Sequence, residues 1–230
     1  MPNTKNPDAR LLSALPYLTP GGTVADIGTD HAYLPIELCR RGICRRAVAC
    51  DINRGPLESA RANIAAAGFS DRIDTLLTDG LHGVEQWHPD NILIFGMGGE
   101  LIARILSEAP WIRDARIGLV LQPMSRAEVL RRYLWENGFS VMGETLSRAD
   151  RIYQTLYARY TGVPEPFDET ELLVGRDCFL LSSPLAAEFI RGRISVLENV
   201  AVGKRAGGAD TAYEDARVKD LRKKLSEVTV

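Results

Sequence analysis

The sequence contains little that would mark a membrane, secreted or metal-binding protein. No apolar run approaches the length of a membrane-spanning helix, and the N-terminus lacks the long apolar core of a secretory signal. We therefore expect a cytoplasmic protein with no membrane partner. Cysteine and histidine are scarce, and their spacing matches no zinc-binding pattern, so we predict neither a metal site nor a disulfide. Those that occur are Cys39, Cys44, Cys50, Cys178, His31, His82 and His88.

Strand-like and helix-like segments alternate along most of the chain, which predicts an α/β protein with a doubly wound, mainly parallel sheet. The 230 residues are 45% hydrophobic and carry a formal net charge of -2, values that suit one globular domain with a smaller appendage. The last two strands follow each other without a helix, so we expect an antiparallel hairpin at one edge. The predicted strands are residues 23–27, 46–50, 73–77, 91–95, 117–121, 139–146 and 152–160. The predicted helices are residues 34–41, 56–67, 101–108 and 126–137.

The loop after the first predicted strand lacks the Gly-x-Gly-x-x-Gly pattern that places a pyrophosphate on bare backbone amides. Only Gly28 is present, and it is followed by Thr29, Asp30 and His31. Because carboxylates here would repel a diphosphate, the loop disfavours a dinucleotide cofactor. S-adenosylmethionine instead carries a sulfonium and an amino group, which Asp26 and Asp30 would attract. The alternative is that these two aspartates only cap the following helix.

Polar and small residues also follow the next three predicted strands, and the carboxyl ends of parallel strands meet at one edge of a sheet. Asp51 with Ile52 follows the second strand, where a carboxylate can accept both hydroxyls of a ribose. Asp79 with Gly80 follows the third, either to bind an adenine amino group or as an ordinary Asp-Gly turn. Gly96 and Gly98 belong to a glycine-rich segment after the fourth strand, which opens the backbone to a ligand more than a turn requires.

Two motifs of nucleobase methyltransferases are missing. No Asn or Asp is followed by Pro-Pro and an aromatic residue, the tetrapeptide that holds an exocyclic amino group. No cysteine follows a proline, so the nucleophile used for carbon-5 methylation of pyrimidines is also lacking. These absences leave a ring nitrogen, or another atom with a free lone pair, as the methyl acceptor.

Three segments resemble the bacterial tRNA adenine-22 N1-methyltransferase family. They are DIGTDHAYLP at residues 26–35, GMGG at 96–99 and LQPM at 121–124, and the resemblance extends over residues 10–160. It implies a Rossmann-like class I methyltransferase domain over residues 1–162 and a helical, coiled-coil-like extension over 163–230. It further implies S-adenosylmethionine as cofactor and an adenosine in the D-arm region of tRNA as substrate. The implied cofactor contacts are Asp26, Gly28, Asp30, His31, Asp51, Asp79 and the Gly96 loop.

Methylation at adenine N1 requires little more than alignment, because the in-plane lone pair can attack the sulfonium methyl directly. Asp30 is the candidate catalytic residue, either stabilising the charge on the product ring or accepting the N6 proton; its other role would be to bind the cofactor's amino group. Tyr33, Met97 and Met124 are candidates to clamp the unstacked adenine, although each could equally pack in the core. For Met124 we favour the core. Arg10 is either a phosphate contact or a solvated side chain.

The last part of the sequence predicts an antiparallel helical hairpin, with helices over residues 185–202 and 211–228 and a reversal at 203–208. Its basic and acidic residues nearly balance, so a solvated face and an RNA-binding face fit equally well. A denser basic cluster, residues 40–41 and 45–46, lies at the amino ends of the strands, opposite the expected site.

Two other functions remain open from the residues alone. A small-molecule methyltransferase would share the cofactor site, although no lid segment interrupts the strands. A protein that binds the adenosyl ligand without catalysis, or that uses the hairpin to dimerise, would also fit. The sequence gives no indication of the oligomeric state.

Overall fold

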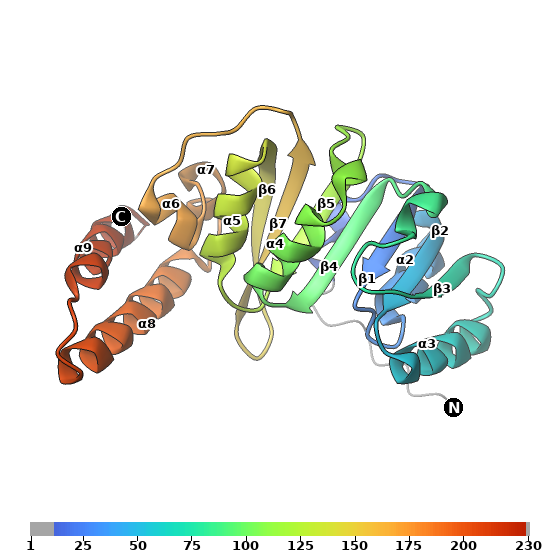
Figure 1. Ribbon diagram of the computed structural model, residues 1–230, viewed down its shortest axis with the longest axis horizontal. Coiled ribbons are helices and arrows are strands. Elements are labelled where there is room, and N and C mark those ends of the chain that lie inside the picture. Colours follow the sequence, from blue (N-terminus) through green and yellow to red (C-terminus); the bar gives the residue numbers. More distant parts are fainter. Residues whose placement is uncertain (1–11, 229–230) are drawn as a thin grey trace.

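The computed structural model describes residues 12–228, and a twisted seven-stranded sheet forms its centre (Figure 1). All seven predicted strands are confirmed, with ends that differ by at most two residues. The observed strands are β1 (Gly22–Ile27), β2 (Cys44–Asp51), β3 (Ile73–Leu77), β4 (Asn91–Met97), β5 (Gly118–Pro123), β6 (Phe139–Arg148) and β7 (Ile152–Tyr160).

The strand order is β3-β2-β1-β4-β5-β7-β6. The first five strands of that order are parallel, and β7 is antiparallel to both of its neighbours. The expected hairpin is therefore confirmed, and β7 lies inside the sheet while β6 forms its edge. Because all five parallel strands point the same way, the loops after β1, β2, β3 and β4 meet at one edge.

Helices cover both faces of the sheet. Neighbouring strand residues alternate between the two sides, so Ile92 and Ile94 pack with α4 and α5, whereas Leu93 packs with α2 and α3. The four predicted helices are confirmed, again with ends within two residues. They are α2 (Tyr33–Arg40), α3 (Arg54–Ala67), α4 (Gly99–Ser107) and α5 (Ala127–Glu136), and three short 3-10 helices add η1 (Leu15–Tyr17), η2 (Val84–Trp87) and η3 (Pro110–Ile112).

The C-terminal part forms its own small core. Two short helices that the sequence analysis missed, α6 (Glu169–Val174) and α7 (Asp177–Leu180), precede the expected hairpin of α8 (Ala186–Ala206) and α9 (Ala212–Val228). The expected reversal at 203–208 is placed too early, because α8 continues through Gly203 and ends at Ala206, with Gly207 as its C-cap. Figure 1 shows α8 and α9 side by side as an arm that projects from the sheet. No helix within residues 12–228 is long and apolar enough to cross a membrane.

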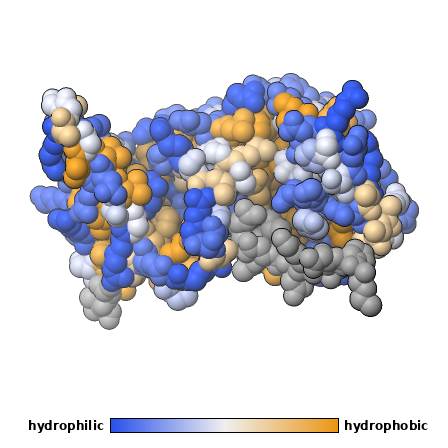
Figure 2. All heavy atoms as spheres, turned by 90° about the horizontal axis from the view of Figure 1, so that it is seen from below, coloured by the Kyte–Doolittle hydropathy of each residue, from blue (hydrophilic) through white to orange (hydrophobic). Residues whose placement is uncertain are grey.

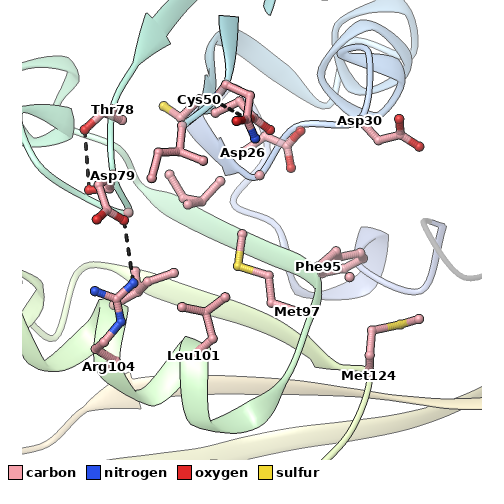
Figure 3. A pocket seen from close by; sticks show the side chains of 18 of the residues that line it. Asp26, Asp30, Cys50, Thr78, Asp79, Phe95, Met97, Leu101, Arg104 and Met124 are labelled. Atoms are coloured by element: carbon pink, nitrogen blue, oxygen red, sulfur yellow. Dashed lines mark hydrogen bonds and ion pairs between the residues drawn. The ribbon is translucent and has the colours of Figure 1, made fainter. Parts of the chain in front are cut away.

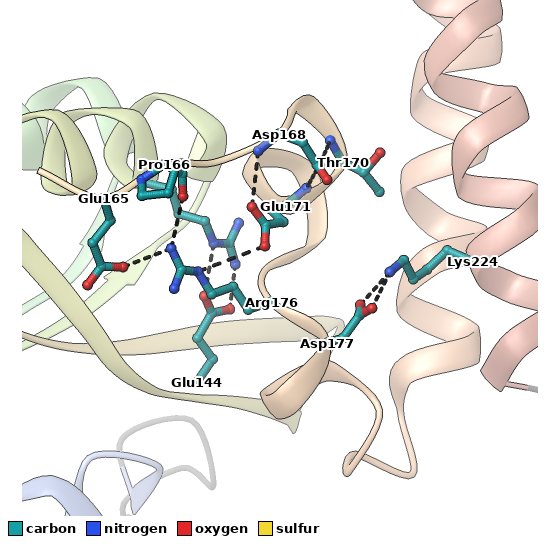
Figure 4. A network of polar contacts seen from close by, with 10 residues as sticks. Glu144, Glu165, Pro166, Asp168, Thr170, Glu171, Arg176, Asp177 and Lys224 are labelled. Atoms are coloured by element: carbon teal, nitrogen blue, oxygen red, sulfur yellow. Dashed lines mark hydrogen bonds and ion pairs between the residues drawn. The ribbon is translucent and has the colours of Figure 1, made fainter.

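A buried ion pair joins this C-terminal part to the sheet and α5. Arg131 is fully buried and donates two hydrogen bonds to Glu144 on β6, at 3.0 and 2.6 Å, and a third to the Leu172 carbonyl on α6 at 2.9 Å. Close by, Arg176 pairs with Glu165 at 2.8 Å (Figure 4). Leu172 itself packs in the same apolar core as α4 and α5. The base of the arm is therefore fixed to the sheet by both polar and apolar contacts.

Candidate active site

A cavity of about 510 Å³ lies at the edge where the parallel strands end (Figure 3). The loops after β1 to β4 meet there, as the sequence analysis expected, and α4 and the end of β5 complete the wall. The cavity is lined by four aspartates and one arginine among otherwise apolar or small residues. The sequence-predicted residues in its wall are Asp26, Gly28, Asp30, Asp51, Ile52, Asp79, Gly80, Gly96 and Met97.

Asp26 is the most deeply placed of the acidic residues. It is only 6% exposed and accepts a hydrogen bond from the Thr29 hydroxyl at 2.6 Å. Burial raises the pKa of its carboxyl to about 6, and the nearby carboxylates of Asp30 and Asp51 add to this rise. The interpretation of Asp26 and Asp30 as helix caps is wrong. The N-cap of α2 is Ala32, whose backbone is left-handed, and no side chain caps the helix.

Asp51 stands at the carboxyl end of β2 and is half-buried. One carboxylate oxygen accepts the backbone N–H of Asn53 at 2.7 Å, which fixes the side chain. Asp51 also lies in the wall of the cavity. A carboxylate held in this way at the end of the second strand can accept a pair of vicinal hydroxyls.

The cavity floor requires glycine at residue 28. Gly28 has a φ of +73°, and a Cβ at this position would lie 2.3 Å from the Met97 side chain. Any larger residue would therefore be strained and would displace Met97, which lies in the wall of the cavity. Gly96, with a φ of +79°, lies at the register shift between Phe95 and Met97 near the end of β4.

Asp79 lies in a turn and also lines the cavity. Its carbonyl accepts the His82 N–H at 3.4 Å, and the Thr78 hydroxyl donates to the His82 carbonyl at 2.8 Å, so the segment is a turn. The Asp79 carboxylate nevertheless faces the cavity, where it lies 3.7 Å from Arg104 on α4 (Figure 3). The turn therefore places a carboxylate in the wall.

Three of the predicted residues that the structure describes lie outside the cavity wall. His31 and Tyr33 pack against each other at 5.6 Å between ring centroids, beside rather than inside the cavity, with His31 3.4 Å from the Asp30 carboxylate. Gly98 is the N-cap of α4. Arg10 lies outside the described residues.

Met124 is half-buried and lines the cavity, so our preference for a core position is wrong. It directly follows β5, where the strand-end rule places it. The sequence analysis missed several other residues of the wall. Those with larger side chains are Ile27, Leu34, Phe95, Leu101, Arg104 and Ile105.

Comparisons with known proteins agree with this site. Residues 8–156 match a methyltransferase domain family. The chain is 32% identical to the tRNA (adenine(22)-N(1))-methyltransferase of Bacillus subtilis over 167 residues. The matched region covers 72% of this chain and 70% of that protein. The structure of the B. subtilis m1A22 tRNA methyltransferase TrmK has a TM-score of 0.76 at 27% identity, over 97% of this chain and 98% of that one. A Streptococcus pneumoniae candidate tRNA (m1A22) methyltransferase, solved with S-adenosyl-L-methionine, has a TM-score of 0.81 at 29% identity, over 94% and 98%.

With its strand order, its acidic strand-end cavity and these matches along most of its length, the chain belongs to the tRNA (adenine-22-N1)-methyltransferase family of class I methyltransferases.

Proposed function

We propose that this protein transfers a methyl group from S-adenosylmethionine to N1 of adenosine 22 in tRNA, in the cytoplasm. The observation that carries the proposal is the acidic cavity at the strand ends, in a chain of this family. We further propose that residues 1–162 form the catalytic domain and residues 163–230 an extension that acts on tRNA.

The cavity fits S-adenosylmethionine because its charge matches. Four aspartates and one arginine line the cavity. This excess of negative charge favours a ligand with positive groups and disfavours a pyrophosphate. Asp26 would hold the amino group, and Asp51 the ribose hydroxyls. Asp79 would accept the adenine amino group, with Gly80 beside the ring. When bound, the cofactor supplies an electrophilic methyl group on a sulfonium.

The protein's own contribution is to orient the target base and to balance its charge. Phe95, Met97 and Met124 present apolar surface in the wall, against which an unstacked adenine can pack. Asp30 has a side chain that is 81% exposed and lines the cavity, so it can reach a base that enters from solvent. Its carboxylate would stabilise the positive product ring or take the N6 proton. No residue has to form a covalent bond with the substrate.

Methyl transfer to unmodified tRNA transcripts tests the function. Nucleoside mass spectrometry and mapping should find N1-methyladenosine at position 22, and replacing that adenosine should abolish it. Cofactor binding is measured separately by calorimetry. Binding without incorporation into any tRNA would contradict the proposal and favour a small-molecule substrate or a non-catalytic role.

Asp30→Ala should lower kcat by about 100-fold, the range expected for loss of one acid–base or charge-stabilising group. Because the side chain is mostly exposed, the fold should be unchanged. Single-turnover methyl transfer with saturating cofactor and tRNA measures the effect, and Asp30→Asn serves as the isosteric control. Unchanged methyl transfer in both variants would remove the catalytic role of Asp30.

Asp26 should give the protein a pH-dependent stability. Its folded pKa of about 6 lies above the unfolded value, so its contribution is full at low pH and is lost as the pH rises through 6. Relative to Asp26→Asn, which keeps an acceptor for Thr29, the unfolding free energy of the wild type should fall by roughly 1.4 kcal/mol between about pH 5 and pH 7.5. Chemical denaturation of both proteins at the two pH values measures this difference. Parallel pH profiles would contradict it.

A further inference from the structure

A second cavity, of about 690 Å³, separates the end of β5 and the β6–β7 hairpin from α8. Met124 lines both cavities, so the second adjoins the acidic one. We call it the arginine groove, after the side chains that distinguish it. It is lined by Pro123, Met124, Ser125, Arg126, Ala127, Arg151, Ile152, Tyr153, Gln154, Glu188, Phe189, Arg191, Gly192, Arg193 and Val196.

The charge of the arginine groove is opposite to that of the acidic cavity. Four arginines line it, from the start of α5, the β6–β7 turn and α8, whereas the single acidic residue in its wall, Glu188, already pairs with Arg148 at 2.5 Å. Glu128 lies 3.1 Å from Arg126 and 3.3 Å from Arg193, and Glu100 lies 3.3 Å from Arg126. These carboxylates hold Arg126 and Arg193 in place. Arg191 is exposed.

Gln154 gives independent evidence for a polar ligand. It lies on β7 in the wall of the groove and is only 7% exposed. Its amide nitrogen is fully buried and has no hydrogen-bond acceptor among residues 12–228. An unpaired buried donor costs about 1–3 kcal/mol. Because this nitrogen has almost no exposed surface in the free protein, rotation of the side chain toward a ligand acceptor in the groove would remove the penalty.

We propose that the arginine groove binds the phosphate backbone of the tRNA next to the target adenosine. This inference rests on the proposed function. It assigns a binding site to the tRNA phosphates, which the acidic cavity would repel. Guanidinium groups bind phosphate oxygens through paired hydrogen bonds, and the Gln154 amide is a further donor. The base then enters past Met124 into the acidic cavity while its backbone stays with the arginines.

The proposal gives α8 a direct role in substrate binding. Apolar residues are gathered along the arm among hydrophilic ones (Figure 2), and exposed Val196 also lines the groove. Because Arg131 and α6 fix the base of the arm to the sheet, α8 holds its arginines at a set position relative to the cavity.

Arg191→Glu and Arg45→Glu form a matched pair of variants. Both reverse one exposed arginine, but Arg45 lies at the amino end of β2, on the opposite edge of the sheet. Arg191→Glu should weaken tRNA binding at least about tenfold and reduce the slope of log affinity against log salt by about one. Arg45→Glu should bind like the wild type, and both should keep wild-type affinity for S-adenosylmethionine.

Gln154→Leu provides a second readout. Removing the unpaired amide should leave the free protein as stable as the wild type or more so, while raising the KM for tRNA. The groove assignment is overturned, and the proposed function stands, if the wild type methylates tRNA while Arg191→Glu and Gln154→Leu have the same tRNA affinity as the control Arg45→Glu. If the wild type binds cofactor but neither binds nor methylates tRNA, both are overturned.

Discussion

Asp51→Ala is expected to weaken the binding of S-adenosylmethionine by about 100-fold, since hydrogen bonds to a charged group each contribute about 1.5–3 kcal/mol. The backbone N–H of Asn53 holds the carboxylate of Asp51 at the end of β2, in the wall of the cavity, where it can accept two hydroxyls. Isothermal titration calorimetry with purified protein measures the change. Activity at saturating cofactor should recover most of its wild-type value.

Asp51→Asn is the control for this result. It keeps an oxygen for the Asn53 N–H but has only one acceptor atom and no charge, so its affinity should fall between those of the wild type and Asp51→Ala. Arg104→Ala removes the cation of the same cavity and should not weaken binding as strongly. An affinity of Asp51→Ala within about threefold of the wild type, a difference of less than 1 kcal/mol, would exclude Asp51 as the ribose ligand.

Arg131→Met should produce the largest loss of stability of any single substitution described here. The change leaves Glu144, whose side chain is 7% exposed, as a buried charge without its cation, and it deprives the Leu172 carbonyl of its donor. Removing one partner of a buried ion pair typically costs about 3–5 kcal/mol. Chemical denaturation measures the loss, and limited proteolysis should show cleavage near α6 before the sheet is attacked.

The double variant Arg131→Met with Glu144→Leu separates lost charge pairing from lost packing. Replacing both members of a buried pair with apolar residues is often neutral, so most of the stability should return. A single variant that is as stable as the wild type would show that the pair does not hold the base of the arm to the sheet. In that case the fixed position of α8 would have to depend on apolar contacts alone.

Much of the fold and of the cavity could be predicted from the sequence because both depend on local patterns. Apolar runs bounded by turn residues marked each strand, and the rule that strand ends meet at one edge was enough to predict that Asp26, Asp51 and Asp79 lie together. The sequence motif at residues 26–35 did not distinguish residues that line the cavity from neighbouring residues that support it. His31 and Ala32 both have positive φ, and with this turn His31 packs on Tyr33 instead of lining the cavity.

What could not be predicted depends on contacts between distant segments. Helices α6 and α7 are six and four residues long, too short for a periodic pattern, and tertiary packing stabilises them. The arginine groove combines residues 123–127, 151–154 and 188–196. The balanced charge of the hairpin concealed it, because most of its basic residues pair with acidic neighbours, as Arg205 does with Asp215 and Arg222 with Glu198.

The contact between α6 and the sheet also bears on how such a protein can change in evolution. Leu172 completes the apolar core around Trp135 and Phe139, and Phe167 stacks on Trp135 at 5.5 Å. A gene fusion that exchanged the tail at residue 162 would remove Leu172 and Phe167 and expose Trp135 and its neighbours to water. A viable recombinant would have to bring its own partners for α5 and β6, so the tail should be inherited together with the sheet and not as a separate module.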